Sequence, residues 1–377
     1  MFERLRQVYQ GAWYKQLFLV GSLLISSAYP IYKNYFYARG VEQYERQVQF
    51  MENRSDFYNP WQYRVFCPLL LQGAKWVYDH TIDRVFPLEE HMHFDDDVTP
   101  QHGVFRAQVR SKDAMIYLGL FILFRLLLQM LIYLLEFSLL AFFVKNNWLI
   151  GLGLLFTAYI TGNGVHNSDL SFNTYLDVVL YLWAGCVILY RRQDAWIILI
   201  TILGALNRET SLLIPVIYFA SRATLPSFVS GQSFRWPPLR TWVITAASGI
   251  LYIAIFAGIR MHYGYRAPEP VTTYQATVGL SLLKVNLASG QALKSYFEMY
   301  GVLSVLWLTA FFTFRCNHVL LRTWFLVLVP VWVLVHLLSS VVAESRCFLV
   351  PVVLVLLPML LEKIEQQSPH VNNTAGI

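Results

Sequence analysis

Three carboxylates follow the first long apolar run of the chain, in a polar stretch where they could act as a general base. Glu42 and Glu45 come shortly after the apolar run 16–37, and Asp56 lies farther along. A carboxylate held at the edge of an apolar layer can take the proton of a reacting hydroxyl group. We therefore treat Glu42, Glu45 and Asp56 as candidate catalytic residues, with ordinary solvated loop charges as the alternative interpretation.

Polar residues that could bind an anion or hydroxyl groups fall in the breaks between later apolar runs. The candidate binding residues are Tyr63, Arg64, His166, Asp169, Asn207, Arg208, Glu209, Glu344 and Arg346. The fork of an arginine presents paired donors that suit a phosphate. Ionisable groups at membrane depth cost roughly 2.5–3.5 kcal/mol each on insertion scales, so they persist with a partner or a function. We favour a cationic pocket for an anionic, lipid-linked ligand, formed by Arg208 and Arg346.

Each of these clusters also has a simpler explanation. Arg64 would snorkel toward ordinary phospholipid headgroups, and the stretch 163–169 would be a tight polar turn. The charges at membrane depth, which include Arg125 and Glu136, would form ion pairs that fix a helix bundle. Asp177 favours a function near 163–169, because an acid inside an apolar run is costly and usually faces a cavity or a partner.

The composition places the chain among membrane proteins. Hydrophobic residues make up 56% of the 377 residues, charged residues only 14%, and the mean hydropathy is +0.45. Soluble domains carry about 25% charged residues. The net charge of +6 comes from Lys and Arg dispersed among apolar runs, without a nucleic-acid motif, so we predict no nucleic-acid partner. The 4 cysteines lie far apart, which argues against a disulfide framework or a zinc site.

The apolar residues gather in segments that we expect to be membrane helices. A helix needs roughly 20 apolar residues to cross the hydrocarbon core, and several of the segments are shorter. The segments are 16–37, 114–144, 148–162, 174–190, 195–206, 211–221, 241–259, 299–314, 321–340 and 347–361. We therefore expect an all-α fold, a polytopic transmembrane helical bundle of about ten membrane segments, in a single domain of residues 1–377.

Positive charges predict the topology of this bundle. The basic residues of the predicted cytoplasmic connections lie at 4–15, 145, 191–192, 222–240 and 315–322. The positive-inside rule places them together only if 195–221 crosses the membrane an even number of times. A hairpin that turns at Asn207–Thr210 on the non-cytoplasmic side is thus favoured over one broken helix. Both termini, including the tail 363–377, are then cytoplasmic.

Two long polar connections, 38–112 and 260–298, are predicted on the non-cytoplasmic face. In the first, the stretch 61–78 has apolar residues at helical spacing but is too short and polar to span, so we expect an interfacial amphipathic helix. Pro68 is compatible with such a helix only in its first turn or at a kink. The stretch 91–97 contains an HxHxD pattern without the rest of a metallohydrolase fold. We predict no cofactor, and a divalent metal is possible but unsupported.

These features together carry a family resemblance. A first apolar segment is followed by the long loop 38–112 with acidic residues, and Tyr63 begins the stretch YRVFCPLL, which is similar to a YRxLxPLL element of bacterial multi-spanning proteins. The stretches 207–211 and 344–351 are similar to polar breaks that recur in the same proteins. In this arrangement the chain resembles the GT-C superfamily of membrane glycosyltransferases. The early loop aspartate of that family would fall at Glu42 or Glu45, and no clear Asp-x-Asp pair is present.

The resemblance implies a polyprenyl-phosphate-linked sugar as donor and a glycan, lipid or protein as acceptor. It implies a bacterial inner membrane location, contact with membrane lipids and an active face on the periplasmic or extracellular side. The phosphate would be neutralised by Arg208 or Arg346 with Arg64, and a loop carboxylate would activate the acceptor for transfer with inversion. A lipid or polysaccharide transporter or flippase, and a polysaccharide polymerase or ligase with a lipid-linked substrate, are the alternatives. The long outer loop favours an enzyme, since a transporter usually shows inverted repeats.

Overall fold

The computed structural model of the chain describes most of its length. The described residues are 13–36, 40–52, 61–91, 111–164, 171–191, 193–223, 236–264, 276–290, 292–294, 296, 303–342 and 344–368. Within these ranges the regular structure is entirely helical and contains no strand. The predicted all-α fold is therefore confirmed.

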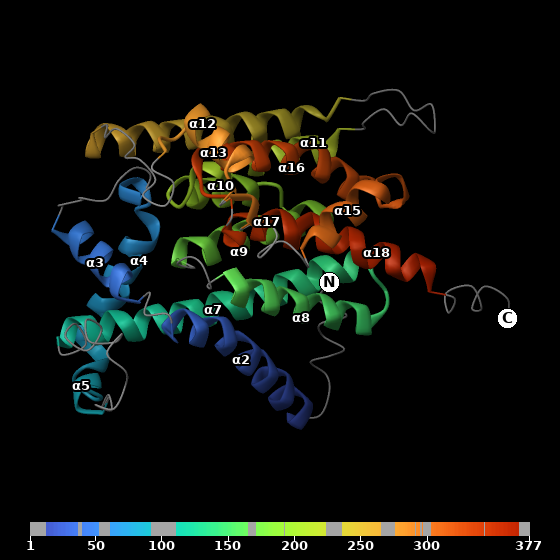
Figure 1. The fold of residues 1–377 in the computed structure, drawn as a ribbon. Coiled ribbons are helices and arrows are strands. Elements are labelled where there is room, and N and C mark those ends of the chain that lie inside the picture. The colour runs from blue at the N-terminus through green and yellow to red at the C-terminus, as the bar shows by residue number, and fades with distance from the viewer. Residues whose placement is uncertain are drawn as a thin grey trace.

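The helices follow one another along the chain with short connections. The first half contains α2 (Trp13–Phe36), α3 (Gly40–Met51), η1 (Trp61–Tyr63), α4 (Phe66–Val77), η2 (Tyr78–Ile82), α5 (Leu88–His91), α7 (Lys112–Phe143), α8 (Asn147–Gly164) and α9 (Phe172–Leu189). The second half contains α10 (Trp196–Ala205), η4 (Glu209–Leu212), α11 (Leu213–Arg222), α12 (Leu239–Tyr263), α13 (Leu280–Ala288), α15 (Ser304–Phe312), η5 (Phe314–Cys316), α16 (Val319–Ser339), η6 (Ser345–Phe348), α17 (Leu349–Pro351), η7 (Val352–Leu356) and α18 (Leu357–Gln367). The long helices run across Figure 1 in roughly the same direction, with α3 and α4 gathered at one end and α18 at the other.

Five helical segments are long and apolar enough to cross a membrane. They are Lys112–Phe143, Phe172–Leu189, Leu239–Tyr263, Val319–Ser339 and Ser345–Gln367. Two apolar helical stretches are shorter, Leu17–Lys33 and Trp196–Ala205. The fold is thus compatible with an integral membrane protein, and each predicted segment contains a helix, but the count of about ten crossings stays a prediction.

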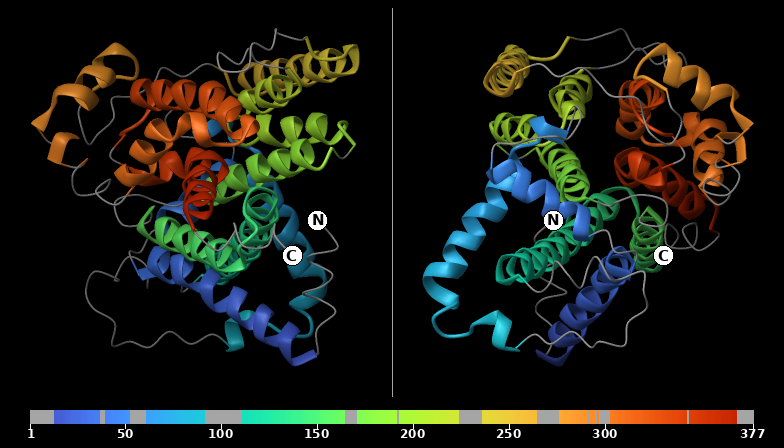
Figure 2. Two further views of the ribbon diagram at one scale, coloured as in Figure 1. Left: turned by 90° about the vertical axis from the view of Figure 1, so that its right-hand side faces the viewer. Right: turned by 60° about the vertical axis from the view of Figure 1, so that its left-hand side comes forward.

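Helix α9 forms the centre of the bundle. Of the residues Phe172–Leu189, 94% are buried within the protein, and the helix contacts α7, α10, α11, α17 and η7. In both views of Figure 2 the green helix α9 lies among the others, with α7 beside it. Because this helix is covered by protein all around, polar side chains on its first turns need partners inside the bundle.

The segment 195–221 forms a hairpin, as the charge pattern predicts. Arg222 at the end of α11 lies 3.0 Å from Asp194, just before α10, and Arg240 at the start of α12 lies 3.6 Å from the same carboxylate. The two helices meet again at the tip, where Gly204 of α10 faces Ser211. The chain therefore reverses at Asn207–Arg208, and one broken helix is excluded.

A second set of contacts joins other connections that were predicted to be cytoplasmic. The backbone amide of Lys145 donates to Glu365 at 2.8 Å, and that of His318 donates to Glu362 at 2.9 Å. Trp324 donates to Ser221 at 2.7 Å, which links the start of α16 to the end of α11. These connections share one end of the bundle, as the predicted topology requires.

The amphipathic helix predicted in the first long loop is present as α4. It begins at Phe66, so Pro68 falls in its first turn, as expected. Leu71 is buried against the bundle, whereas Leu69 and Trp76 are 52% and 62% exposed. The exposed apolar side chains are suited to an interfacial helix. The loop 260–298 also contains an unpredicted helix, α13, whose Asn286 donates to the carbonyl of Leu337 in α16.

Replacing Gly204 by alanine should destabilise the hairpin. A Cβ at this position would lie 2.5 Å from the Cβ of Ser211, so the two segments would have to move apart. We expect a loss of about 1–3 kcal/mol in the free energy of unfolding, measured by denaturant titration in detergent micelles. Gly249→Ala in α12, where the new Cβ would meet nothing within 4 Å, is the matched control. Equal stability of the two variants would contradict the close approach.

Candidate functional site

The polar end of the bundle is centred on the tip of the hairpin. The backbone amide of Phe66 donates to the carbonyl of Leu206 at 3.1 Å, which docks the start of α4 on the tip. The thiol of Cys67 lies 3.5 Å from the amide oxygen of Asn207. Burial raises the pKa of this thiol, so Cys67 acts as a neutral donor. The residues before α4 are therefore held beside Arg208 and Glu209.

Asn207 connects this tip to the start of α9. Its side-chain amide donates to the carbonyl of Asn173 at 3.0 Å, and its amide oxygen accepts from the side chain of Asn173 at 3.2 Å. Asn207 is 1% exposed. The two hydrogen bonds satisfy buried amide groups whose burial without partners would cost free energy. Asn207 therefore holds the hairpin tip against the start of α9.

Arg208 points into the bundle and pairs with the first turns of α9. It donates to the hydroxyl of Thr174 at 2.5 Å and lies 3.6 Å from a carboxylate oxygen of Asp177. Asp177 is 1% exposed, and neither of its carboxylate oxygens accepts a hydrogen bond from the described residues. A buried acid of this kind needs a nearby positive charge, so Asp177 holds the guanidinium of Arg208 in place.

Glu209 bridges two further arginines at the same tip. One of its carboxylate oxygens lies 3.5 Å from Arg64 and the other 3.4 Å from Arg260 near the end of α12. The guanidinium of Arg260 stacks on the ring of Tyr63 at 4.4 Å, and the hydroxyl of Tyr63 donates to the carbonyl of Gly264 at 2.9 Å. These contacts thus hold the end of α12 against Tyr63 and Arg64.

Arg346 brings another positive charge to the cluster. It lies 2.6 Å from Glu344, with a second contact of 2.8 Å through Nε. Burial lowers the pKa of Arg64 to about 10; Glu209 and Asp177 raise it, and Arg208 and Arg346 lower it. Arg64, Arg208 and Arg346 are therefore close enough to interact electrostatically. Together with Arg260 they exceed their carboxylate partners Asp177, Glu209 and Glu344 by one charge, and this net positive charge is suited to an anionic ligand.

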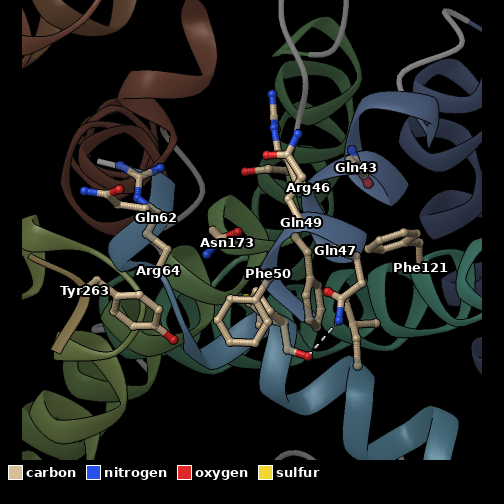
Figure 3. Close-up of a pocket in the computed structure, with 15 residues that line it drawn as sticks. Gln43, Arg46, Gln47, Gln49, Phe50, Gln62, Arg64, Phe121, Asn173 and Tyr263 are labelled. Atoms are coloured by element: carbon tan, nitrogen blue, oxygen red, sulfur yellow. Dashed lines mark hydrogen bonds between the residues drawn. The ribbon is translucent and has the colours of Figure 1, made fainter. Parts of the chain in front are cut away.

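A cleft opens beside Arg64 between α3, α4 and the start of α9. It holds about 720 Å³ of empty space, a figure that includes its open mouth. Figure 3 shows Gln62, Arg64 and Asn173 on one side of it and Phe121 on the other. The cleft therefore joins a cationic end to a neutral polar and aromatic lining.

The structure brings most of the predicted binding residues together. Those that meet at the polar end are Tyr63, Arg64, Asn207, Arg208, Glu209, Glu344 and Arg346. His166 and Asp169 lie outside the described residues. Their predicted role stays a prediction.

Of the three candidate bases, the structure describes the side chain of Glu45 alone. Asp56 lies outside the described residues, and Glu42 belongs to α3 without a described side chain. Glu45 is exposed on α3 and does not line the cleft. Neighbours of both glutamates on α3, among them Gln43 and Gln47, do line it, so this helix borders the cleft.

Two charged residues within α7 contact neighbours outside the arginine cluster. Arg125 donates to Gln43 of α3, and Glu136 accepts from Thr157 of α8 at 2.6 Å. The stretch 91–97, which contains the HxHxD pattern, lies mostly outside the described residues. In the part of the chain that the structure covers, no group of three or more His, Cys, Asp or Glu side chains is arranged to hold a metal ion.

Neutralising Glu209 should strengthen anion binding at this site. Its carboxylate competes with an incoming anion for Arg64 and Arg260, and its side chain is 33% exposed. We expect Glu209→Gln to bind inorganic pyrophosphate about two- to fivefold more tightly, the range for a partly exposed ion pair. Calorimetric titration measures this, with Glu365→Gln at the opposite end as control. Unchanged or weaker binding by Glu209→Gln would contradict the arrangement.

Comparison of the chain with family models, curated proteins and solved structures found no match.

Proposed function

We propose that the protein is a membrane glycosyltransferase that moves a sugar from a polyprenyl-phosphate-linked donor to an acceptor. The observation that carries the proposal is the meeting of Arg64, Arg208 and Arg346 at one end of an apolar bundle, beside a cleft. Guanidinium groups bind phosphate oxygens in pairs. An isoprenoid tail would lie along the apolar helices, with its phosphate at their polar end.

In the proposed reaction the protein supplies positive charge to the leaving phosphate and a general base to the acceptor hydroxyl. The acceptor hydroxyl oxygen attacks the anomeric carbon, and the carbon–oxygen bond to the phosphate breaks with its electron pair on the phosphate. Arg208 and Arg346, with Arg64, stabilise the charge that develops on this leaving group. A carboxylate of the first loop, Glu42, Glu45 or Asp56, takes the proton, and the configuration of the sugar inverts.

The proposed topology follows from the two ends of the bundle. The end that contains Asp194, Arg222 and Arg240 would face the cytoplasm, together with both termini. The end that contains Arg208 and the cleft would face the periplasm or the cell exterior. About ten segments would cross or enter the membrane, and the proposed location is a bacterial inner membrane.

Incubation of the purified protein with polyprenyl-phosphate sugars tests the proposal. We expect release of polyprenyl phosphate that depends on an acceptor. Arg346→Ala should abolish this release, and alanine variants of Glu42, Glu45 and Asp56 should identify the base. A variant that removes a positioned general base is expected to lose about 100- to 10,000-fold in turnover.

The same preparation separates the proposal from its alternatives. A transporter or flippase would move a lipid-linked sugar across proteoliposomes without releasing lipid phosphate, and that result would contradict the proposal. Two polar breaks, at 207–211 and 344–348, lie at the ends of helices rather than within them. This arrangement is less typical of a transporter, in which broken helices lie near the membrane midplane. A polymerase or ligase would release polyprenyl phosphate or diphosphate only with a glycan acceptor.

A further inference from the structure

The cleft beside Arg64 has a lining that the donor phosphate alone does not explain. Side-chain amides dominate its polar part, and they belong to Gln43, Gln47, Gln49, Gln62 and Asn173. Aromatic rings form much of the rest, and they belong to Phe50, Phe121, Phe172 and Tyr263. An amide both donates and accepts hydrogen bonds, as a hydroxyl group does. Such a lining is suited to a ligand with many hydroxyl groups and an apolar face.

Gln62 supplies a donor that no described residue uses. The residue is 6% exposed and lines the cleft, and its side-chain nitrogen is buried without a hydrogen-bond partner among the described residues. A buried donor left without an acceptor costs free energy. An acceptor oxygen of a bound ligand would remove that cost. Gln47, in contrast, already donates to the carbonyl of Pro68 at 3.1 Å.

The charge of the lining selects against cations. Its ionisable side chains are Arg46, Arg64, Cys67 and Tyr263, and no carboxylate of the described residues lines the cleft. In Figure 3, Arg46 lies across the space from Arg64, so positive charge borders two sides of the cleft. An amino sugar with a free ammonium group would meet two arginines in the lining itself, where the described residues present no carboxylate.

We infer that this cleft binds the ring of a sugar that carries no positive charge, with Gln62 as a residue that determines its specificity. The inference rests on the proposed function, because it places the transferred or accepting ring directly beside the phosphate-binding arginines. The ring's hydroxyl groups bind the amides, and its apolar face packs on the aromatic side chains. Arg64 then marks the boundary between the sugar and the phosphate.

Calorimetric titration of the full-length protein with methyl glycosides tests this inference, in a detergent without a sugar headgroup. Methyl glucoside and methyl N-acetylglucosaminide are the uncharged probes, and methyl glucosaminide is the cationic probe. We expect at least one uncharged glycoside to bind in the millimolar range, at least about tenfold tighter than the cationic one. Gln62→Leu should weaken this binding about tenfold, whereas Gln72→Leu, at an exposed position of α4, should not.

Gln62→Glu provides a second variant that preserves the size of the side chain. It should weaken binding of the uncharged glycosides and strengthen binding of methyl glucosaminide, because a carboxylate would then face the cleft. Absence of glycoside binding, a preference for the cationic probe by the native protein, or equal loss in Gln62→Leu and Gln72→Leu would overturn the inference.

Titration of the same proteins with farnesyl phosphate separates the inference from the proposed function. Gln62→Leu should bind farnesyl phosphate like the native protein, and Arg208→Gln should bind it more weakly. If farnesyl phosphate binding depends on Arg208 while glycoside binding does not depend on Gln62, only the sugar site is wrong. If Arg208→Gln binds farnesyl phosphate unchanged, the phosphate site itself is wrong.

Discussion

Replacement of Arg208 by glutamine should reduce the release of polyprenyl phosphate from a lipid-linked sugar at least about 100-fold. Arg208 is held inside the bundle by Thr174 at 2.5 Å and by Asp177 at 3.6 Å. Its charge is therefore already oriented before the leaving phosphate develops negative charge. A group that is positioned in advance stabilises a transition state without reorganisation.

Turnover of Arg208→Gln, Arg208→Lys and Arg240→Gln at saturating donor measures this effect. Arg208→Lys keeps the charge but loses the paired donors, so it should retain part of the activity. Arg240→Gln removes a 71% exposed arginine at the opposite end and should leave turnover unchanged. Equal activity of Arg208→Gln and Arg240→Gln would rule out a role for Arg208 in the reaction.

The second large effect is expected on stability, at the acid that holds Arg208. Asp177→Ala should lower the free energy of unfolding by about 3–5 kcal/mol, because it leaves a buried guanidinium without its counter-ion. The side chains of Asp177 and Arg208 are 1% and 11% exposed, respectively. Denaturant titration in detergent micelles measures the loss.

Two further variants control the Asp177 result. Asp113→Ala removes a 61% exposed acid that pairs with Lys75, and it should cost at most about 1 kcal/mol. The double variant Asp177→Ala with Arg208→Ala should cost less than the sum of the single variants, since removing both charges leaves neither unpaired. An additive double variant would show that the two groups are not coupled.

The sequence predicts the hairpin and the amphipathic helix because each has a local or compositional cause. The basic residues at 222–240 require an even number of crossings before them, and the contact of Arg222 with Asp194 confirms the reversal. Pro68 restricts where α4 can begin, and the helix begins at Phe66. Charge distribution and proline geometry act over short distances along the chain.

Other parts of the site depend on contacts that no local pattern encodes. Arg260 lies one residue beyond the predicted segment 241–259, so nothing in the sequence connects it with Glu209 or Tyr63. Asp177 is conspicuous as an acid in an apolar run, but only the fold shows that Arg208 is its partner. Nothing in the sequence distinguishes Gln62 from the other glutamines, and only the fold places it in the lining of the cleft. Tertiary packing decides these roles.

The phosphate site at the polar end of the bundle is tested most directly by comparing the binding of a long-chain polyprenyl phosphate with that of the corresponding uncharged polyprenol. Arg64, Arg208 and Arg346 would contact the phosphate, and charged hydrogen bonds contribute about 1.5–3 kcal/mol each. We expect the phosphate to bind at least about 100-fold more tightly than the alcohol, and we expect Arg208→Gln and Arg346→Gln each to lose most of this preference. Equal binding of the two lipids, or a preference that survives both variants, would contradict a phosphate site at the polar end of the bundle.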